Sequence, residues 1–150
     1  MITIRPMMLA DIPAVMEIEH RSFSLPWSEN SFREELTDND KAHFFVAVMA
    51  ERVIGAAGYW QIEDECHIST VGVHPDWRRQ GAGELLLVHM LTEARAWGAA
   101  LAILEVRVSN AAAIRLYKKY GFETNRVRKS YYRDNGEDAL EMMTQLIRSL

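Results

Sequence analysis

The stretch from Thr70 to Leu86 constrains the fold most, because its local pattern changes twice within a short length. It begins in a β-branched run that ends at Val73, and a Pro-containing break follows. From 84 to 97 apolar residues recur at helical spacing. The pattern predicts a strand, a loop and a helix, with a basic, glycine-rich turn just before the helix. That turn consists of Arg78, Arg79, Gln80, Gly81, Ala82 and Gly83.

This turn has the chemistry of an anion-binding site. Because glycine has no Cβ, the backbone at Gly81 and Gly83 can turn sharply and bring its N–H groups close to another molecule. The first N–H groups of a helix lack partners within the helix and lie at the positive end of its dipole. Arg78 and Arg79 add two permanent cations. We therefore expect the turn to bind a phosphate, and a pyrophosphate in particular.

Two other phosphate-binding loops do not fit the sequence. A dinucleotide-binding fingerprint needs a third glycine where this chain has Leu86. A P-loop needs Gly-Lys followed by Ser or Thr, whereas Gly83 is followed by Glu84. For the bare Gly-x-Gly pattern, an ordinary strand-to-helix turn is the alternative.

Composition indicates one globular domain spanning residues 1–150. The chain has 150 residues, 49% hydrophobic and 25% charged. It has no apolar run of about 20 residues, and its N-terminus lacks the basic-then-apolar order of a signal peptide. We therefore expect a cytoplasmic protein that does not bind membranes. A net charge of −4 argues against direct nucleic-acid binding.

Cysteine and histidine are too few or too scattered for a disulfide or a common metal motif. Cys66 is the only cysteine of the sequence, and the five histidines show no ligand spacing, so we expect no metal. Cys66 is either a small residue within a strand or a nucleophile. A second basic group either meets a phosphate or forms a solvated strand face. This group consists of Arg126, Arg128 and Lys129.

The remaining patterns predict a mixed α/β fold. Helices are expected after Asp11, after the Ser28 cap, over 84–97, and from a cap at Ser109 or Asn110 to Tyr120. The sheet should be mostly antiparallel, with about seven strands flanked by about four helices. The strands are expected over 2–5, 43–50, 53–61, 66–73, 101–108, 122–132 and 139–146.

Three residues in the second half of the chain have both a chemical and a structural interpretation. Glu105 interrupts an apolar strand, so it is either an edge or ion-paired carboxylate or a general base. Asn110 can cap the following helix and can also contact a ligand. Tyr117 lies roughly on the same helix face as Asn110, seven residues on. Tyr117 is either core or the donor of a proton to a leaving thiolate.

The segment from Val71 to Leu86, VGVHPDWRRQGAGELL, resembles the acetyl-coenzyme-A signature of the GCN5-related N-acetyltransferases (GNAT). Three further segments narrow the resemblance to bacterial ribosomal-protein alanine N-acetyltransferases and the related archaeal N-terminal acetyltransferases. They are LEVRVSNAAAIRLYKKYGF from Leu104, SFSLPWSENSF from Ser22, and Tyr131-Tyr132 followed by GEDA. Together these segments span nearly the whole chain.

The resemblance implies a GNAT fold and a role for each matching residue. It makes Glu105 the base and Tyr117 the acid, and it makes Asn110 a coenzyme contact. The matching coenzyme contacts are Val71, Gly72 and Val73 for the pantetheine arm, Arg78, Arg79, Gln80, Gly81, Ala82, Gly83 and Glu84 for the pyrophosphate, and Tyr117. The acceptor side is implied to consist of Phe23, Leu25, Trp27, Tyr131 and Tyr132. From the residues alone, the loop Phe23–Trp27 either packs into the core or lines a binding surface.

The function implied is transfer of an acetyl group from acetyl-CoA to the α-amino group of a protein N-terminus, with a ribosomal protein as the partner. An acetyltransferase for a polyamine or amino sugar, and a non-catalytic acetyl-CoA-binding module, are the alternatives. The family usually has Pro after the paired tyrosines, where this chain has Arg133. That departure leaves the identity of the acceptor open, and the oligomeric state, monomer or weak dimer, is also open.

Overall fold

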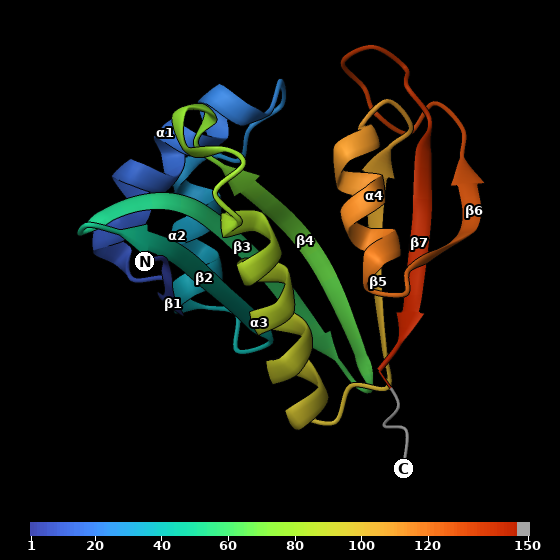
Figure 1. Ribbon diagram of the computed structural model, residues 1–150, viewed down its shortest axis with the longest axis horizontal. Coiled ribbons are helices and arrows are strands. Elements are labelled where there is room, and N and C mark those ends of the chain that lie inside the picture. The colour runs from blue at the N-terminus through green and yellow to red at the C-terminus, as the bar shows by residue number, and fades with distance from the viewer. Residues whose placement is uncertain (147–150) are drawn as a thin grey trace.

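The computed structural model describes residues 1–146 and contains one mixed sheet with four α-helices (Figure 1). The helices are α1 (Ile12–Ser22), α2 (Glu29–Thr37), α3 (Ala82–Ala96) and α4 (Ala111–Lys119). The strands are β1 (Thr3–Pro6), β2 (Ala42–Met49), β3 (Arg52–Ile62), β4 (Glu65–Val73), β5 (Leu101–Arg107), β6 (Glu123–Arg128) and β7 (Ala139–Gln145). The expected fold class, a mostly antiparallel sheet flanked by helices, is confirmed.

The sheet has the strand order β1-β2-β3-β4-β5-β7-β6. All neighbouring strands are antiparallel except β4 and β5, which are parallel. Helix α3 makes the crossover between these two strands, as a parallel connection requires. The stretch from Thr70 to Leu86 therefore contains the end of β4 and the beginning of the crossover that places β5 beside β4.

Strands β4 and β5 are paired at one end only. Their register covers Glu65–His67 against Leu101–Ile103, although β4 continues to Val73 and β5 to Arg107. Beyond this short ladder the two strands diverge, as Figure 1 shows. The sheet therefore splits into a half with β1–β4 and a half with β5–β7, and the split exposes an edge of each.

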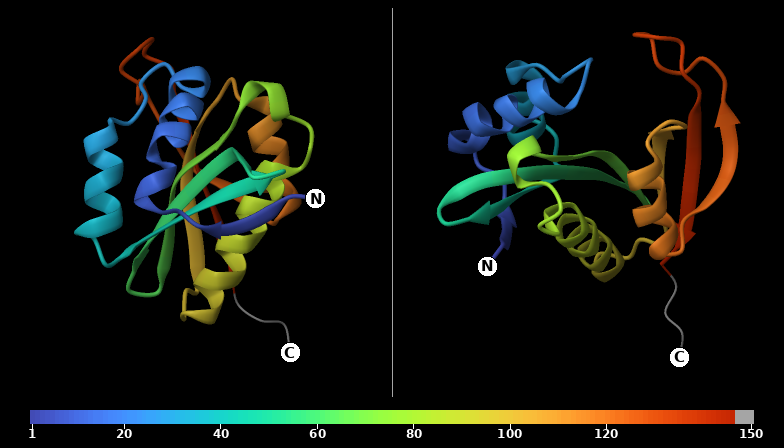
Figure 2. Two further views of the ribbon diagram at one scale, coloured as in Figure 1. Left: turned by 90° about the vertical axis from the view of Figure 1, so that its left-hand side faces the viewer. Right: turned by 45° about the horizontal axis from the view of Figure 1, so that its top comes forward.

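The helices cover the two halves unequally. Figure 2 shows α1 and α2 together on one face of the first half and α3 on the opposite face. Helix α4 lies against the second half, on the same side of the sheet as α3 (Figure 1). The amphipathic pattern of α1 explains its position, because Ile12, Val15 and Ile18 are all buried. No helix of residues 1–146 covers the face of β5–β7 that points away from α4 (Figure 2).

Two element boundaries differ from the sequence prediction by more than one residue. Helix α3 begins at Ala82 rather than Glu84, because Gly81 takes the left-handed conformation with φ 89° and acts as the N-cap. Gly83 lies within the first helical turn and has no left-handed φ, so it does not need the freedom expected of it. Strand β6 ends at Arg128 instead of continuing to 132, because Ser130 takes φ 49° and donates its N–H to Asp138.

The second basic group is a set of ion pairs on the strand surface. Glu141 on β7 is 4% exposed and accepts from Arg126 and Arg128 on the neighbouring β6. Asn125 also donates to Glu141 at 2.6 Å, and this hydrogen bond followed by the Arg128 contact lowers the pKa of the Glu141 carboxyl. Lys129 pairs with Asp138. These residues therefore have carboxylate partners of their own, which favours the structural interpretation over phosphate binding.

Cys66 is fully buried on β4, and burial followed by the nearby Glu93 charge raises the pKa of its thiol to about 12. A thiol with that pKa stays protonated at neutral pH, so it is a poor nucleophile. Cys66 is a small core residue, as the simpler interpretation held.

Candidate functional site

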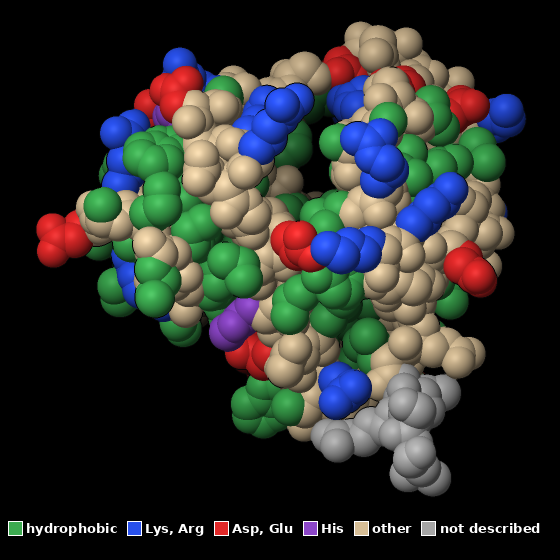
Figure 3. All heavy atoms as spheres, in the orientation of Figure 1, with side chains coloured by type: hydrophobic (Ala, Val, Ile, Leu, Met, Phe, Trp, Pro, Cys, Tyr) green, Lys and Arg blue, Asp and Glu red, His purple; other side chains and the backbone are tan. Residues whose placement is uncertain are grey.

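The split between β4 and β5 is occupied by two adjoining chambers. One has a volume of about 410 Å³, and we call it the loop chamber because the loop Phe23–Trp27 lines it. The other has a volume of about 600 Å³, and we call it the turn chamber because the turn before α3 lines it. Both chambers are lined by Ser22, Phe23, Val71, Asn110 and Tyr117. Figure 3 shows the hollow between the half that carries α3 and the half that carries α4.

The turn chamber is built at the N-terminus of α3. The first helical hydrogen bond runs from the N–H of Leu85 to the carbonyl of Gly81. The N–H groups of Ala82, Gly83 and Glu84 therefore have no partner within the helix and lie at its positive end. A Cβ at Gly81 would meet no other atom within 4 Å, so the space beside this turn is open. Among the predicted turn residues, Gln80 alone does not line the chamber.

The end of β4 supplies backbone donors to the same chamber. His74 donates its N–H to the carbonyl of Ile54 on β3. Because alternate residues of an antiparallel strand point their N–H groups to opposite sides, Val73 and Val71 direct theirs away from β3 and into the split. The carbonyl of Val73 confirms this direction, since it accepts from Ser22 Oγ at 3.3 Å.

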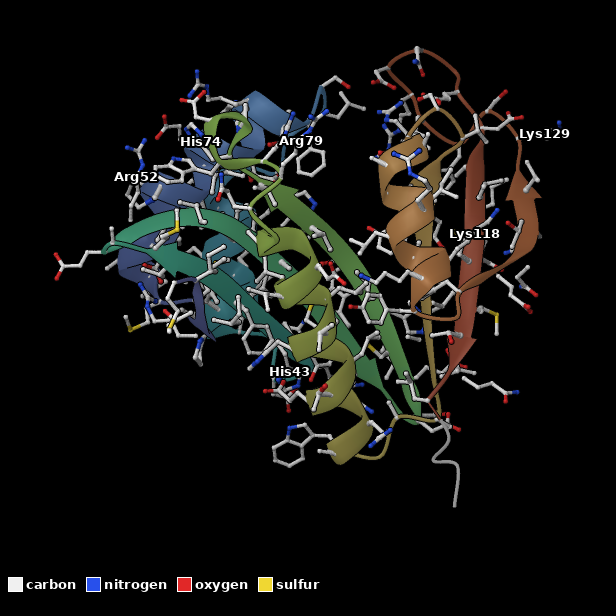
Figure 4. All side chains as sticks on the ribbon, in the orientation of Figure 1. His43, Arg52, His74, Arg79, Lys118 and Lys129 are labelled. Atoms are coloured by element: carbon white, nitrogen blue, oxygen red, sulfur yellow. The ribbon has the colours of Figure 1, made fainter. Side chains whose placement is uncertain are left out.

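The two arginines outweigh the one carboxylate at the mouth of the turn chamber. Glu84 is a carboxylate in the first turn of α3, but it accepts from Lys119 Nζ at 2.6 Å and from Tyr120 Oη. The hydrogen bond from Lys119, followed by that from Tyr120, lowers the pKa of the Glu84 carboxyl. Arg78 donates back to the carbonyl of Val73. Figure 4 shows Arg79 on the turn, beside the gap that separates it from α4.

The loop chamber contains Glu105, which lies with Arg107 on the face of β5 opposite the buried Leu104 and Val106. The side chain of Arg107 is fixed by charge pairs with Asp134 at 2.8 Å and Glu137 at 3.3 Å. The structure thus places Glu105 in a polar recess rather than in an apolar core. It is half-buried, accessible from the chamber, and without a salt bridge among the described residues.

Tyr117 connects the two chambers. It lies on α4, is 8% exposed, and packs its ring against Phe122 with centroids 5.7 Å apart. Burial, followed by the proximity of Tyr132, raises the pKa of the Tyr117 hydroxyl to about 12, so the hydroxyl keeps its proton at neutral pH. Asn110 is the N-cap of α4 and accepts from the N–H of Ala113 at 3.2 Å. Asn110 lines both chambers as well, so its capping and ligand-contact interpretations are compatible.

The loop between α1 and α2 both packs into the core and lines the chamber. Trp27 contacts Phe32 and Phe44 at centroid distances of 5.0 and 5.7 Å and stacks on Trp60 at 6.2 Å. These contacts hold the loop against the sheet, while Phe23, Leu25 and Trp27 remain at the chamber wall. The two alternatives left open by the sequence are therefore not exclusive.

The β6–β7 loop forms the opposite wall. Tyr132 lines the chamber, and its ring centroid lies 3.9 Å from the guanidinium carbon of Arg107. Tyr131 does not line it; this side chain is 44% exposed and packs edge-on against Tyr132. Ser24 donates to Asp134, which joins the two loops across the top of the chamber. Arg133 makes no hydrogen bond or ion pair with another described residue.

Sequence reasoning missed several residues of this site, namely Glu19, Ser22, Ser69, Thr70 and Arg107. Glu19 carried a readable signal, because it follows Val15 by four positions and therefore falls on the buried face of α1. Arg107 is two residues from Glu105 and so shares its face of the strand. Ser69 lies at an irregularity in the β3–β4 register that the sequence does not reveal.

Residues 1–146 contain no group of three or more His, Cys, Asp or Glu side chains that could hold a metal ion. The absence of a metal remains a prediction. In the same part of the chain no helix is long and apolar enough to cross a membrane.

Residues 12–122 match the acetyltransferase (GNAT) family. The chain belongs to this family. The GNAT fold expected from the sequence is confirmed by the solved structure of the ribosomal-protein-S18-alanine N-acetyltransferase from Escherichia coli. That structure aligns with a TM-score of 0.90 at 35% identity, over 100% of this chain and 97% of the other.

Relatives by sequence extend over nearly the whole GNAT chain. The ribosomal protein bS18-alanine N-acetyltransferase of Escherichia coli (strain K12) is 37% identical over 151 residues, covering 93% of this chain and 95% of the relative. The N-alpha-acetyltransferase RimI of Mycobacterium tuberculosis (strain ATCC 25618 / H37Rv) is 33% identical over 147 residues, covering 94% and 90%. The expected activity, acyl transfer by an N-acetyltransferase, is confirmed.

Proposed function

We propose that this protein transfers the acetyl group of acetyl-CoA to the α-amino group of the N-terminal alanine of ribosomal protein bS18, in the cytoplasm. The observation that carries the proposal is the pair of chambers that meet at Tyr117, one basic and rich in backbone donors, the other containing Glu105. Two substrates can thus approach one point from opposite sides. The names of the relatives supply the choice of acceptor.

The turn chamber fits the diphosphate end of acetyl-CoA. Its open space at Gly81, the unpaired N–H groups at the start of α3, and the cations Arg78 and Arg79 suit a pyrophosphate. The N–H groups of Val71 and Val73 suit the amide and thioester oxygens of an extended pantetheine arm. Bound in this way, acetyl-CoA supplies an activated acyl group.

The chemistry requires three actions from the chain. Glu105, directly or through water, takes a proton from the acceptor ammonium, whose ordinary pKa is near 8. A backbone N–H of Val71 or Val73 hydrogen-bonds the carbonyl oxygen on which negative charge develops. The free amine attacks the thioester carbon, so that a C–N bond forms and the C–S bond breaks. Tyr117 donates a hydrogen bond from its hydroxyl to the departing thiolate, and the proton that the attacking nitrogen loses passes to solvent or to the thiolate. No covalent enzyme intermediate is needed, in agreement with the buried, protonated Cys66.

Thiol release tests the proposal directly. The protein and acetyl-CoA are mixed with a peptide beginning with alanine and carrying the bS18 N-terminal sequence, with the same peptide acetylated at its N-terminus, and with a polyamine and an amino sugar. We expect turnover with the free peptide alone. Preferential turnover of the small amines would support the alternative substrate class, and acetyl-CoA binding without turnover of any amine would indicate a binding module.

A further inference from the structure

Glu19 is a buried carboxylate in the wall of the loop chamber. It lies on the sheet-facing side of α1, one helical turn after Val15, and is only 4% exposed. A charged group in such a position is costly to bury unless it is paired or hydrogen-bonded. The residues of the proposed acid–base chemistry, Glu105 and Tyr117, come from the other half of the sheet, so Glu19 faces the same chamber from the opposite wall.

The protein compensates the charge of Glu19 only in part. Its Oε1 accepts the backbone N–H of Trp27 at 2.9 Å. Burial outweighs this hydrogen bond and the weaker influence of His20, so the pKa of the Glu19 carboxyl is raised. No Lys, Arg or His of residues 1–146 forms a salt bridge with it. The ionised carboxylate would therefore gain stability from a cation that enters the chamber.

The other charges of the loop chamber leave room for such a cation. The charged side chains that line it are Glu19, Glu105 and Arg107. Arg107 is already neutralised by Asp134 and Glu137. What remains is two carboxylates, one on α1 and one on β5, around a space that the rings of Trp27 and Tyr132 help to enclose.

We propose that Glu19 binds the α-ammonium group of the acceptor and positions it for deprotonation by Glu105. This inference rests on the proposed function and adds a division of labour to it, since one carboxylate holds the ammonium and the other takes a proton. An ammonium has three N–H donors, so it can be held by Glu19 and still direct one proton towards Glu105. The raised pKa of the Glu19 carboxyl reflects burial without a cation, and an ammonium removes that deficit.

A purely structural role is the competing explanation, because Glu19 also anchors the loop through Trp27. Glu19→Gln separates the two roles. The amide keeps the shape and an oxygen that can accept from the Trp27 N–H, but it has no charge with which to attract an ammonium. Glu17→Gln is the matched control, since Glu17 lies on the same helix and is exposed away from the chamber, near His74 and Arg21.

The experiment compares two ligands that differ in the amine alone: a peptide beginning with alanine, and its desamino analogue, in which a propionyl group replaces the alanyl residue. With wild-type protein, the inhibition constant of the desamino peptide should be at least about tenfold larger than the dissociation constant of the free peptide. This factor is expected for the loss of a charged hydrogen bond. In Glu19→Gln, KM for the free peptide should rise by a similar factor, and the difference between the two ligands should shrink to what Glu105 alone contributes. Glu17→Gln should behave as wild type.

Calorimetry with acetyl-CoA and thermal unfolding accompany these measurements. Coenzyme affinity should be unchanged in Glu19→Gln, and stability should not fall, because the amide removes a charge that is costly to bury. An unchanged peptide KM in a folded Glu19→Gln protein would overturn the inference. Equal binding of the two peptides to wild type would also overturn it, and this result needs no variant. Wild-type protein that acetylates no peptide at all would refute the proposed function instead, so the two failures are distinguishable.

Discussion

Tyr117 lines both chambers, and Tyr117→Phe removes its hydroxyl while keeping the ring that packs on Phe122. Burial raises the pKa of this hydroxyl to about 12, whereas an ordinary thiol has a pKa near 8.5. At about 1.4 kcal/mol per pKa unit, complete proton transfer to a thiolate is uphill by about 5 kcal/mol. We therefore expect Tyr117 to act mainly as a hydrogen-bond donor to the sulfur as charge develops there.

A hydrogen bond to a charged acceptor contributes about 1.5–3 kcal/mol. Tyr117→Phe should consequently lower kcat by about 10- to 150-fold. This range lies mostly below the roughly 10²–10⁴-fold effect of a group that transfers its proton completely. KM for acetyl-CoA should change little, because Tyr117 contributes one hydroxyl among many contacts of the turn chamber.

Steady-state thiol release with the alanine peptide measures the effect, and calorimetry checks coenzyme affinity. Tyr120→Phe is the control, since Tyr120 is the C-cap of the same helix, donates to Glu84 and lines neither chamber. Wild-type turnover by Tyr117→Phe would refute a chemical role and return the residue to the plain core. A loss well above 10³-fold would refute the hydrogen-bond account and indicate complete proton transfer.

Three further changes test other parts of the molecule. Gly81→Asp should abolish acetyl-CoA binding by calorimetry, whereas Gly98→Asp, with the same left-handed backbone strain and open space at the far end of α3, should retain it. Glu105→Gln should lower kcat by about 10²–10⁴-fold, with partial recovery at higher pH, where more of the acceptor amine is already neutral; a pH-independent deficit would contradict its role as a base. The contacts that lower the pKa of Glu141 stabilise the folded protein at pH values above the ordinary carboxyl pKa. This contribution is lost as the pH falls through the lowered pKa. Glu141→Gln should thus reduce the free energy of unfolding at pH 7 and flatten its dependence on acid, which urea titrations at several pH values would measure.

Much of this fold could be predicted because the hydrophobic periodicity of each helix and strand is visible in residues that are close together in the sequence. The strand, the turn and helix α3 follow from residues close in the chain, as do the Ser28 and Asn110 caps that the structure contains. The boundary errors occurred where a single residue adopts left-handed φ, at Gly81 and Ser130. Such a conformation depends on contacts such as the Ser130–Asp138 hydrogen bond, which join positions that no local pattern relates.

The site was predicted less completely, because its second carboxylate and its closing contacts are long-range. Glu105 was recognisable as a charge within an apolar strand. Glu19 falls on the buried face of α1 by its spacing from Val15, but an acidic residue ordinarily faces water, so the spacing alone did not assign it to the site. Its burial depends on β4 lying beneath α1 and on Trp27 turning back to donate its N–H, and neither is visible in the sequence. The Ser24–Asp134 contact joins residues 110 positions apart.

The divergence of β4 and β5 explains how these two strands can line the two chambers. If the two strands stayed paired beyond Ile103, the N–H groups of Val71 and Val73 would form hydrogen bonds with β5. The split releases them, and it also weakens the connection between the two halves at that end. Arg107 on β5 restores the connection, because it donates to Asp134, which also accepts from Ser24 of the opposite half. Glu105, on the same face of β5, lines the loop chamber. Glu105, the proposed base, and Arg107, which helps to close the loop chamber, therefore share one face of β5. A peptide N-terminus that reached Glu105 would enter between the two loops that Arg107 helps to hold together.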